Sequence, residues 1–399
     1  MSGHTEVHTP VGGRVMTRPF AILLLIAGIG GLVTLWRFIN GIASVSNLNN
    51  GYPWGVWISI DVVVGTAIGC GGFAIGLLVY ILNRGQYHPL VRPAVLTSLL
   101  GYGLAVVAVA IDLGRYWGLW KVPTHIWRWT HSPQLEVALC VAAYVLVLMV
   151  ELSPAFFEKW KDSSNSFLRS LSERGLTFMD RALVWILALG LLLPAMHQSS
   201  LGTMMLLPGP RVNPLWNTPW LPFFFLVNCI IIGFAVVVLE ATFSAVAFGR
   251  KRETSMLASL SKVIAGVATF WVAFRIVEVA VTGKLGFIGS GKGLAFLAEI
   301  LLTAIGALIL FSGNLRAQAS WQVRAAMLLL LGGIAHRVNT YLVAFTPGEN
   351  YSYFPSVPEL FITFGIIAAE VAIYLAIVKT FPILSGKPSA AGKEIRGSV

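Results

Sequence analysis

The residues best suited to chemistry in this chain are ionisable side chains embedded in long apolar segments. Carboxylates and histidines can relay protons there, and arginine can donate hydrogen bonds to a carbonyl or hold negative charge. Each charge costs about 2.5–3.5 kcal/mol near the centre of a bilayer, so we expect these groups to face a bundle interior, pair, or lie near an interface. The acids are Asp61, Asp112, Glu136, Glu151, Glu240, Glu278, Glu299 and Glu370, and the bases are Arg275, Arg337, His197 and His336.

The metal-binding residue types do not form a metal-site pattern. Cys70, Cys140 and Cys229 each lie in an apolar run without CxxC spacing, which excludes an iron–sulfur or zinc site in this chain. A b-type haem usually needs two histidines on facing helices, and only His197 and His336 lie at membrane depth. One haem is geometrically possible, but a histidine that is hydrogen-bonded within the protein or to a quinone is the favoured interpretation.

Composition identifies the elements that must position these residues. Of 399 residues, 56% are apolar and 11% are charged, whereas soluble domains carry about a quarter charged residues. The net charge of +11 is typical of basic loops in a membrane protein and does not indicate nucleic-acid binding. Apolar stretches of about 20 residues predict an all-α integral membrane protein with about ten transmembrane helices. They are 20–39, 55–82, 91–114, 134–152, 178–198, 219–247, 258–282, 292–312, 320–344 and 357–381.

The basic residues predict the orientation. Alternate loops carry 19 Lys and Arg on one side and 7 on the other, which places both termini in the cytoplasm. We therefore predict a cytoplasmic tail over 1–19, a membrane domain over 20–382 and a flexible cytoplasmic tail over 383–399. The first span lacks a cleavage pattern, which is typical of a retained anchor. The opposite loops, 40–54, 115–133, 199–218 and 345–356, are rich in Trp, Pro, Asn and Gly, which suits folded caps or a docking surface.

The predicted depth of each ionisable residue in the membrane places most of them in the non-cytoplasmic half. Asp112 with Arg115, and Arg275 with Glu278, are i,i+3 pairs that are expected to meet on a helix face. Simple ion pairing or snorkelling to water remains an alternative for single residues near a helix end. Glu240 and Glu370 lie toward the cytoplasm and either extend a proton path or bond a neighbouring helix. The ten residues in the non-cytoplasmic half are Asp61, Asp112, Arg115, Glu136, His197, Arg275, Glu278, Glu299, His336 and Arg337.

This arrangement suits a site for a lipophilic quinone. Quinone reduction consumes two electrons and two protons, so each carbonyl needs a hydrogen-bond donor and carboxylates must relay protons. Aromatic walls are available from Trp54, Trp57, Tyr116 and Trp117, although Trp and Tyr also belt the interfaces of most membrane proteins. Composition alone does not separate a quinone site from a proton-coupled transporter.

Several segments carry a resemblance to a known family. The chain resembles the membrane subunits of periplasmic [NiFe] hydrogenases of the HybB type, a branch of the NrfD/polysulfide-reductase membrane-subunit family. The resemblance runs from about residue 10 to 385. The segments are NGYPWGVWISIDVVVGTAIGCGGFA (50–74), YILNRGQYHPLVRPAVLTSLLGYGL (80–104), AIDLGRYW (110–117), LLPAMHQSS (192–200), NPLW (213–216) and YLVAFTPGENYSYFP (341–355).

The resemblance implies a ten-helix, quinone-reactive subunit built around two four-helix bundles, about 55–200 around the quinone and about 219–345. It implies menaquinone as cofactor and neither haem nor an iron–sulfur cluster in this chain. The implied partners are a periplasmic ferredoxin-like iron–sulfur subunit and the hydrogenase small and large subunits, on the periplasmic side of the bacterial inner membrane. The family's functional positions fall on Asp112, Arg115, Glu136, His197 and Arg337, whereas His336 does not fit its pattern.

Together these observations predict an oxidoreductase subunit with quinone reductase or quinol oxidase activity. A proton-coupled transporter would need paired broken helices, and only 65–76 is Gly-rich. A structural anchor would not need the ten ionisable residues. The same quinone role with another dehydrogenase or reductase remains open. The catalytic residues are expected to be Asp112, His197, Glu136 and Arg115; the quinone contacts Trp54, Asp61, Tyr116, Trp117, His197 and Gln198; and the proton path Glu136, Arg275, Glu278, Glu299, Arg337, Glu240 and Glu370.

Overall fold

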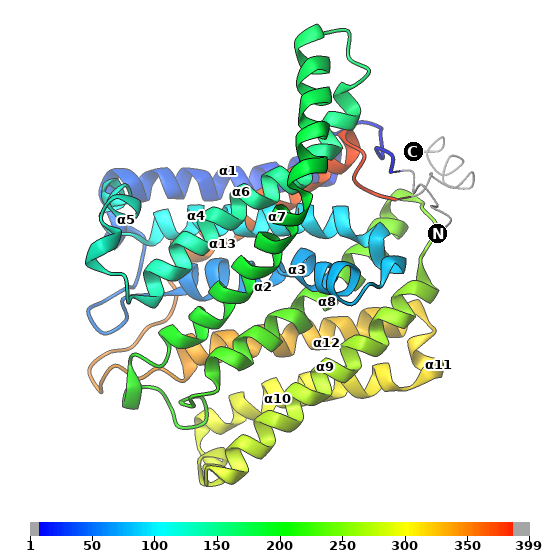
Figure 1. The fold of residues 1–399 in the computed structure, drawn as a ribbon. Helices are drawn as coiled ribbons and strands as arrows, with labels where there is room; N and C mark the ends of the chain where they lie inside the picture. Colours follow the sequence, from blue (N-terminus) through cyan, green and yellow to red (C-terminus); the bar gives the residue numbers. More distant parts are fainter. Residues whose placement is uncertain (1–7, 386–399) are drawn as a thin grey trace.

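A computed structural model describes residues 8–385 and confirms the all-α membrane architecture (Figure 1). Within these residues ten helices are long and apolar enough to cross a membrane. The predicted tails 1–19 and 383–399 lie partly outside the described residues, and the domain limits stay predictions. The ten are α1 Arg18–Asn40, a composite span Trp57–Ile81, Gly85–Asp112 (mostly α4, Val91–Asp112), α6 Pro133–Trp160, α7 Ser166–Met204, α8 Leu221–Phe248, α9 Thr254–Val281, α10 Gly291–Phe311, Ala319–Val343 (mostly α12, Ala319–Val338) and α13 Val357–Thr380.

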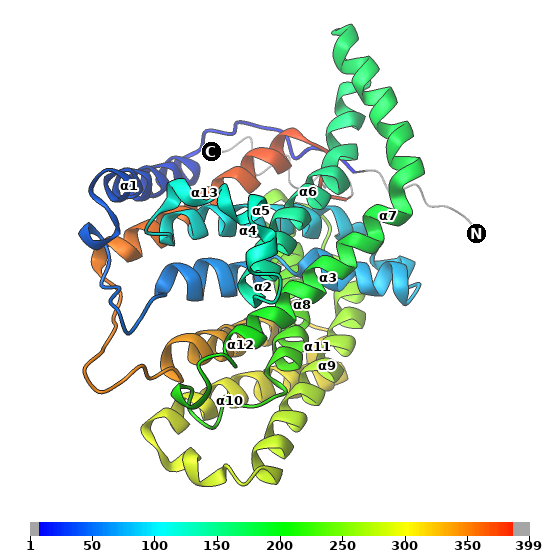
Figure 2. The same ribbon diagram turned by 60° about the vertical axis from the view of Figure 1, so that its left-hand side comes forward.

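The bundle has two distinct ends (Figures 1 and 2). One end, which we call the capped end, carries the loops 41–56, 113–132, 205–220, 282–290 and 344–356. At the other, the terminal end, the first and last described residues lie together, because His8 forms a β-bridge with Ser385. The short helices outside the spans are η1 Ile42–Ser44, η5 Tyr116–Gly118, α5 Lys121–Thr124, η6 Ile126–Arg128, η7 Gly209–Arg211, η8 Leu285–Gly289 and α11 Gly313–Arg316.

Many spans contact their neighbours in the chain, and other contacts join spans that are far apart in the sequence, such as the composite span with α8 and α8 with α12. The composite span contacts α4, α4 contacts α6, and α6 contacts α7; we call these four spans the first helix group. Helices α8, α9, α10 and α12 contact one another and form the second helix group. Helix α13 packs against α1 and also against α4 and the start of the composite span. Gly30 and Gly365 allow this close pairing, since a Cβ on Gly30 would lie 2.6 Å from the Gly365 Cα.

Helix α7 is much longer than the predicted span 178–198. Its 39 residues would extend about 58 Å, nearly twice the hydrocarbon thickness of a bilayer. The extra turns begin at Ser166, where the Asn165 side chain caps the helix by accepting a hydrogen bond from the Phe167 amide at 2.9 Å. They are polar and therefore escape an apolar-window search. The joined ends of α6 and α7 project from the bundle as a hairpin in both views (Figures 1 and 2).

The second span is a broken helix. It runs as η2 Trp57–Val64, a π-helix, then α2 Gly65–Ile68, a break at Gly69 and Cys70, α3 Gly71–Gly76 and η3 Leu77–Ile81, again π-helical. Glycines let neighbouring helices approach this segment closely, and a Cβ on Gly233 of α8 would lie 2.6 Å from the Cys70 carbonyl oxygen. π-Helical turns occur frequently at functional sites. This span carries Asp61 and Cys70 into the middle of the fold.

Candidate functional site

A cation and a carboxylate meet at the capped end, where α1 and α4 finish. Arg37 of α1 is fully buried, and its Nε and Nη2 donate to the carbonyls of Ile111 (2.6 Å) and Leu113 (2.5 Å) on either side of Asp112. Arg37 and Asp112 interact electrostatically. Arg37 Nη1 and Asp112 Oδ1 are nevertheless both buried without a hydrogen-bond partner. The two side chains are not within ion-pair distance of each other in the described part of the chain. We call them the Asp112 pair, since a buried donor and a buried acceptor without partners at one end of the bundle can take a polar ligand group.

The predicted contact between Asp112 and Arg115 is wrong. Helix α4 ends at Asp112, and Leu113 is extended with φ −68° and ψ 117°, so the i,i+3 geometry does not apply. Arg115 is exposed, and no ion pair joins it to Asp112 within residues 8–385. Arg37 takes its place. Its position three residues before the end of an apolar helix resembles that of a loop base, so no pattern in the sequence assigned it to the site.

Glu359 fastens the loops around this pair. Its carboxylate accepts hydrogen bonds from the Tyr353 hydroxyl (2.6 Å), the Asn47 amide (3.1 Å) and the Ser356 amide (2.8 Å). The last contact belongs to a capping box at the start of α13. Burial and the bond to Glu359 raise the pKa of Tyr353, which therefore stays a donor at neutral pH. Glu359 thus joins two loops to α13 within electrostatic reach of Asp112.

Below this pair lies a cavity of about 390 Å³ between the composite span, α4, α8, α12 and α13. Its walls are mainly Ile, Leu and Val side chains, and three acids, Asp61, Glu240 and Glu370, line it. Asp61 Oδ2 accepts a hydrogen bond from Thr363 at 2.9 Å, whereas the buried Oδ1 has no partner. Tyr374 donates to Glu240 at 2.6 Å. We call this the acidic cavity.

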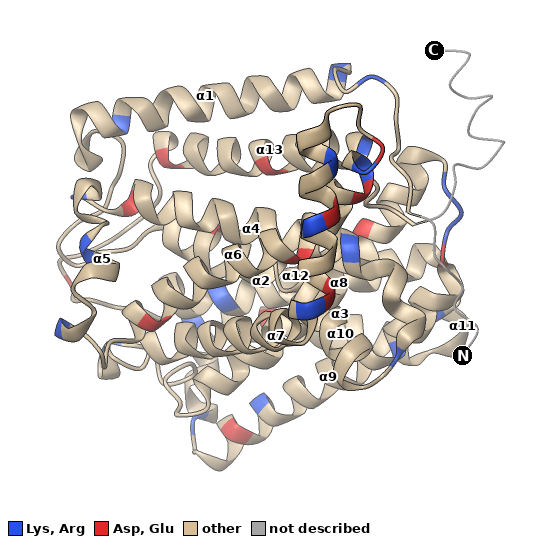
Figure 3. Cartoon of the chain, turned by 45° about the horizontal axis from the view of Figure 1, so that its top comes forward, with Lys and Arg blue, Asp and Glu red and all other residues tan. Residues whose placement is uncertain are grey.

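Helix α13 orders these acids along the membrane axis. Glu359, Thr363, Glu370 and Tyr374 follow one another down the helix, and Figure 3 shows acidic positions spaced along it. At 1.5 Å per residue, the last three lie about 6, 16 and 22 Å below Glu359. Glu359 interacts with Asp112, Thr363 with Asp61, and Tyr374 with Glu240, while Glu370 lies on α13 itself. From the capped end, the acids therefore follow in the order Asp112, Asp61, Glu370 and Glu240.

Arg337 joins the two helix groups in a second polar region, which we call the Arg337 network. From α12, its Nε donates to Asn228 Oδ1 (2.8 Å) and its Nη1 to the Val63 carbonyl (2.9 Å). Its Nη2 donates to Gln198 Oε1 (2.7 Å) and the Phe225 carbonyl (2.9 Å). Arg337 is fully buried, and no carboxylate lies within ion-pair distance of it in the described part of the chain.

His197 belongs to this network and not to the Asp112 pair. Its Nδ1 lies 3.4 Å from the Tyr102 hydroxyl, and its Nε2 lies 3.1 Å from Gln198 Nε2. Tyr102 is ten residues before Asp112 in α4, a separation of about 15 Å along the helix. The structure therefore places the two predicted catalytic residues in separate sites.

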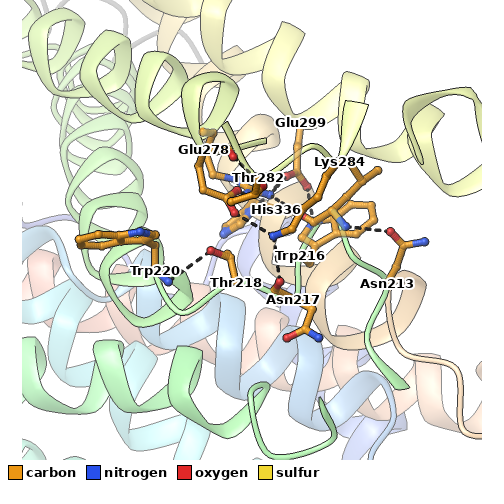
Figure 4. Close-up of polar contacts among 12 residues, drawn as sticks. Asn213, Trp216, Asn217, Thr218, Trp220, Glu278, Thr282, Lys284, Glu299 and His336 are labelled. Atoms are coloured by element: carbon orange, nitrogen blue, oxygen red, sulfur yellow. Dashed lines mark hydrogen bonds and ion pairs between the residues drawn. The ribbon is translucent and has the colours of Figure 1, made fainter. Parts of the chain in front are cut away.

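A third polar region lies in the second helix group near the capped end, and we call it the Glu299 cluster (Figure 4). The predicted Arg275–Glu278 contact is present at 3.1 Å. Glu299 lies 3.7 Å from Arg275 and 3.1 Å from His336 Nδ1. Lys284 closes the cluster from the loop side, 2.9 Å from Glu278. Opposite charges alternate from the loop inward, which compensates each buried ion.

The other predicted site residues lie at the capped end. Glu136, in the first turn of α6, and Trp117 are exposed. Tyr116 packs against Phe38 with ring centroids 4.7 Å apart, beside the Arg37 guanidinium. Trp54 donates from Nε1 to the Tyr341 carbonyl at 3.1 Å. Of these residues, Tyr116 is the one that adjoins the Asp112 pair.

The contacts of the two membrane-depth histidines are mostly with other side chains of the protein. Both ring nitrogens of His197 lie against Tyr102 or Gln198, and His336 Nδ1 lies against Glu299. His336 Nε2 has no partner, but its ring is packed by Trp271 and Phe225, with centroids 5.0 and 5.4 Å away. Axial ligation by His197 would require one of its hydrogen bonds to break, and axial ligation by His336 would require the rings around it to move.

Comparisons with known proteins agree with the sequence resemblance. The family model described as polysulphide reductase, NrfD, matches residues 44–343. The chain is 38% identical to the probable Ni/Fe-hydrogenase 2 b-type cytochrome subunit of Escherichia coli K12, over 94% of both chains. It is 28% identical to the integral membrane subunit of menaquinone reductase from Nitratidesulfovibrio vulgaris Hildenborough, over 63% of this chain and 59% of that protein.

A further relative belongs to another kind of redox complex. A selenate reductase subunit of Mesobacillus selenatarsenatis SF-1 is 25% identical over 61% of this chain and 60% of that protein. These relatives are subunits of redox complexes by name, which supports an oxidoreductase-subunit role at that level. With the ten apolar helices and the match over residues 44–343, they show that the chain is a multi-pass membrane protein of the NrfD family.

Proposed function

We propose that this chain is the quinone-reactive membrane subunit of a respiratory complex. It passes electrons between an iron–sulfur subunit docked on the capped end and menaquinone, and the attached enzyme is a [NiFe] hydrogenase. The capped end faces the periplasm of a bacterial inner membrane, in agreement with the basic residues of the opposite loops. The names of the hydrogenase and menaquinone reductase relatives support these partners.

The observation that carries the proposal is the Asp112 pair above the acidic cavity. Menaquinone, when bound, takes up two electrons and two protons. Arg37 Nη1 is available to donate a hydrogen bond to a carbonyl oxygen, and Asp112 Oδ1 is available to hold a proton beside it. Tyr116 and Phe38 supply an aromatic wall. The apolar walls of the cavity suit an isoprenoid tail. Asp61, which lines the same cavity, has an Oδ1 atom without a hydrogen-bond partner.

A photoreactive menaquinone analogue tests this placement in the purified complex. We expect labelling in the peptides that contain Arg37 and Asp112, and protection by excess menaquinone. Labelling confined to other helices would refute the site. The same preparation tests the proposed absence of haem, since a reduced-minus-oxidised visible spectrum is expected to lack haem bands. Haem bands that co-purify with this chain would overturn that part of the proposal.

We also propose that protons reach the quinone from the terminal end along α13. The route is Glu240, Tyr374, Glu370, Asp61 and Asp112, in the order that the helix gives them. Each charge that crosses is worth about 2.3 kcal/mol per 100 mV of membrane potential. The Glu299 cluster lies in the other helix group, and we assign Arg275, Glu278 and Glu299 to holding that group together at the capped end.

Charge movement in proteoliposomes tests the route. The unaltered complex is expected to build a membrane potential during turnover with menaquinone. Glu240→Gln is expected to abolish most of that potential, because an amide cannot release and rebind the proton. Glu173→Gln, in the exposed first half of α7, is the matched control. Turnover of the unaltered complex without any potential would contradict the route.

A further inference from the structure

Two of the three cysteines form a buried pair with no assigned role. Cys70 lies at the break between α2 and α3, and Cys229 lies on α8; both are 0% exposed. Each thiol donates to a carbonyl of its own span, Cys70 Sγ to Thr66 at 3.3 Å and Cys229 Sγ to Leu226 at 3.0 Å, and the two thiols interact electrostatically. Gly233, one turn after Cys229, brings the α8 backbone against the Cys70 carbonyl. The third cysteine, Cys140, is buried on α6 and serves as an internal comparison.

The surroundings of the pair favour thiol chemistry. Cys70 Sγ lies 3.3 Å from the Tyr102 hydroxyl, which lies 3.4 Å from His197 Nδ1. Arg337 acts electrostatically on both sulfurs, and no described carboxylate lies within ion-pair distance of its guanidinium. A thiolate, not a thiol, is the reactive form of cysteine, and a nearby cation stabilises it. The Tyr102–His197 contact offers a path for the departing proton.

We propose that Cys70 and Cys229 are a redox-active dithiol that closes reversibly to an intramembrane disulfide. Two S–H bonds break and one S–S bond forms, so the thiols are oxidised by two electrons and release two protons. A quinone is the oxidant and becomes the quinol. The proposal rests on the proposed function only in taking a quinone as the oxidant. Quinones serve as the final oxidant of dithiols in bacterial disulfide formation.

The location gives the bond a structural consequence. Cys70 belongs to the first helix group and Cys229 to the second, so a disulfide would link the two groups covalently at the level of the Arg337 network. A disulfide requires Cα atoms within about 4.4–6.8 Å, and the Gly233 contact keeps the two segments close. The helix break at Gly69 and Cys70 gives the backbone local freedom to adjust. An oxidised quinone pool would thus stiffen the contact between the groups.

Differential alkylation of the purified complex tests the pair. The complex is incubated with excess menaquinone or with dithiothreitol, denatured in one alkylating reagent, reduced, and treated with a second, isotopically distinct one. After menaquinone we expect most Cys70 and Cys229 to carry the second label, and a Cys70–Cys229 linked peptide in samples that are not reduced. Dithiothreitol should reverse both signals. Absence of the linked peptide from the unaltered complex overturns the proposal.

Variants and a parallel assay separate the causes of each result. Cys229→Ser is expected to abolish the linked peptide, whereas Cys140→Ser is expected to retain it. Equal second labelling of Cys140 in the unaltered complex would mean non-specific oxidation and would overturn the pairing. Menaquinone turnover is measured in the same preparation. Turnover without a linked peptide rejects the dithiol and leaves the proposed function intact. In a preparation that shows no menaquinone turnover, the linked peptide could form after treatment with diamide but not after treatment with menaquinone. That result would reject menaquinone as the oxidant and as the substrate of this chain.

Discussion

Asp112→Asn is expected to lower quinone-dependent turnover by about a hundredfold or more, the usual range for losing a general acid or base. The asparagine keeps the shape of the side chain but cannot hold and release a proton. It also removes the negative charge that acts electrostatically on the buried Arg37 guanidinium. Turnover of the purified complex with a soluble electron donor and a menaquinone analogue measures the effect. We expect kcat to fall, with KM for the quinone changed far less.

Two controls keep this result specific to the site. Asp162→Asn alters an exposed acid in the loop between α6 and α7 and should leave turnover unchanged. Arg37→Lys keeps the positive charge but loses the fork that spans the Ile111 and Leu113 carbonyls, so KM for the quinone should rise. Wild-type turnover in both Asp112→Asn and Arg37→Lys would remove the Asp112 pair from the mechanism.

The ten helices could be predicted from the sequence because each needs about 20 consecutive apolar residues, a local property. Local signals also account for several ends, such as the Ser356–Glu359 capping box that starts α13. Where polar residues continue a helix, as in the first turns of α7, an apolar window stops too early. The Asp112–Arg115 contact failed for a related reason. The i,i+3 rule holds only inside a helix, and α4 ends at Asp112.

The sites themselves depend on information that a single sequence lacks. Hydropathy and chain order indicate the depth of Asp61, Glu240 and Glu370 but not the rotation of their helices. Rotation decides that Asp61 meets Thr363, 302 residues away, and that all three acids line one cavity. The same limit explains why Asp112 and His197 were expected together. Chain order predicts both in the outer half of the membrane, whereas His197 contacts Tyr102, about 15 Å along α4 from Asp112.

Arg337→Leu is expected to destabilise the protein severely. It removes four hydrogen bonds and leaves Gln198 Oε1, Asn228 Oδ1 and the carbonyls of Val63 and Phe225 short of a donor. Each buried acceptor left without a partner costs about 1–3 kcal/mol. Typical folding free energies are about 5–15 kcal/mol. We therefore expect a large loss of monodisperse protein after detergent extraction, and a lowered apparent Tm.

Arg324→Leu is the matched control on the same helix. Arg324 is exposed and lies 4.6 Å over the Trp321 ring, so its loss leaves no buried acceptor without a donor. Arg337→Lys should fall between the two variants, because one ammonium cannot reach acceptors from α7, α8 and the composite span together. If Arg337→Leu matched Arg324→Leu in yield and apparent Tm, the helix groups would have to be held by apolar packing alone. The network would then be available for chemistry without a structural cost.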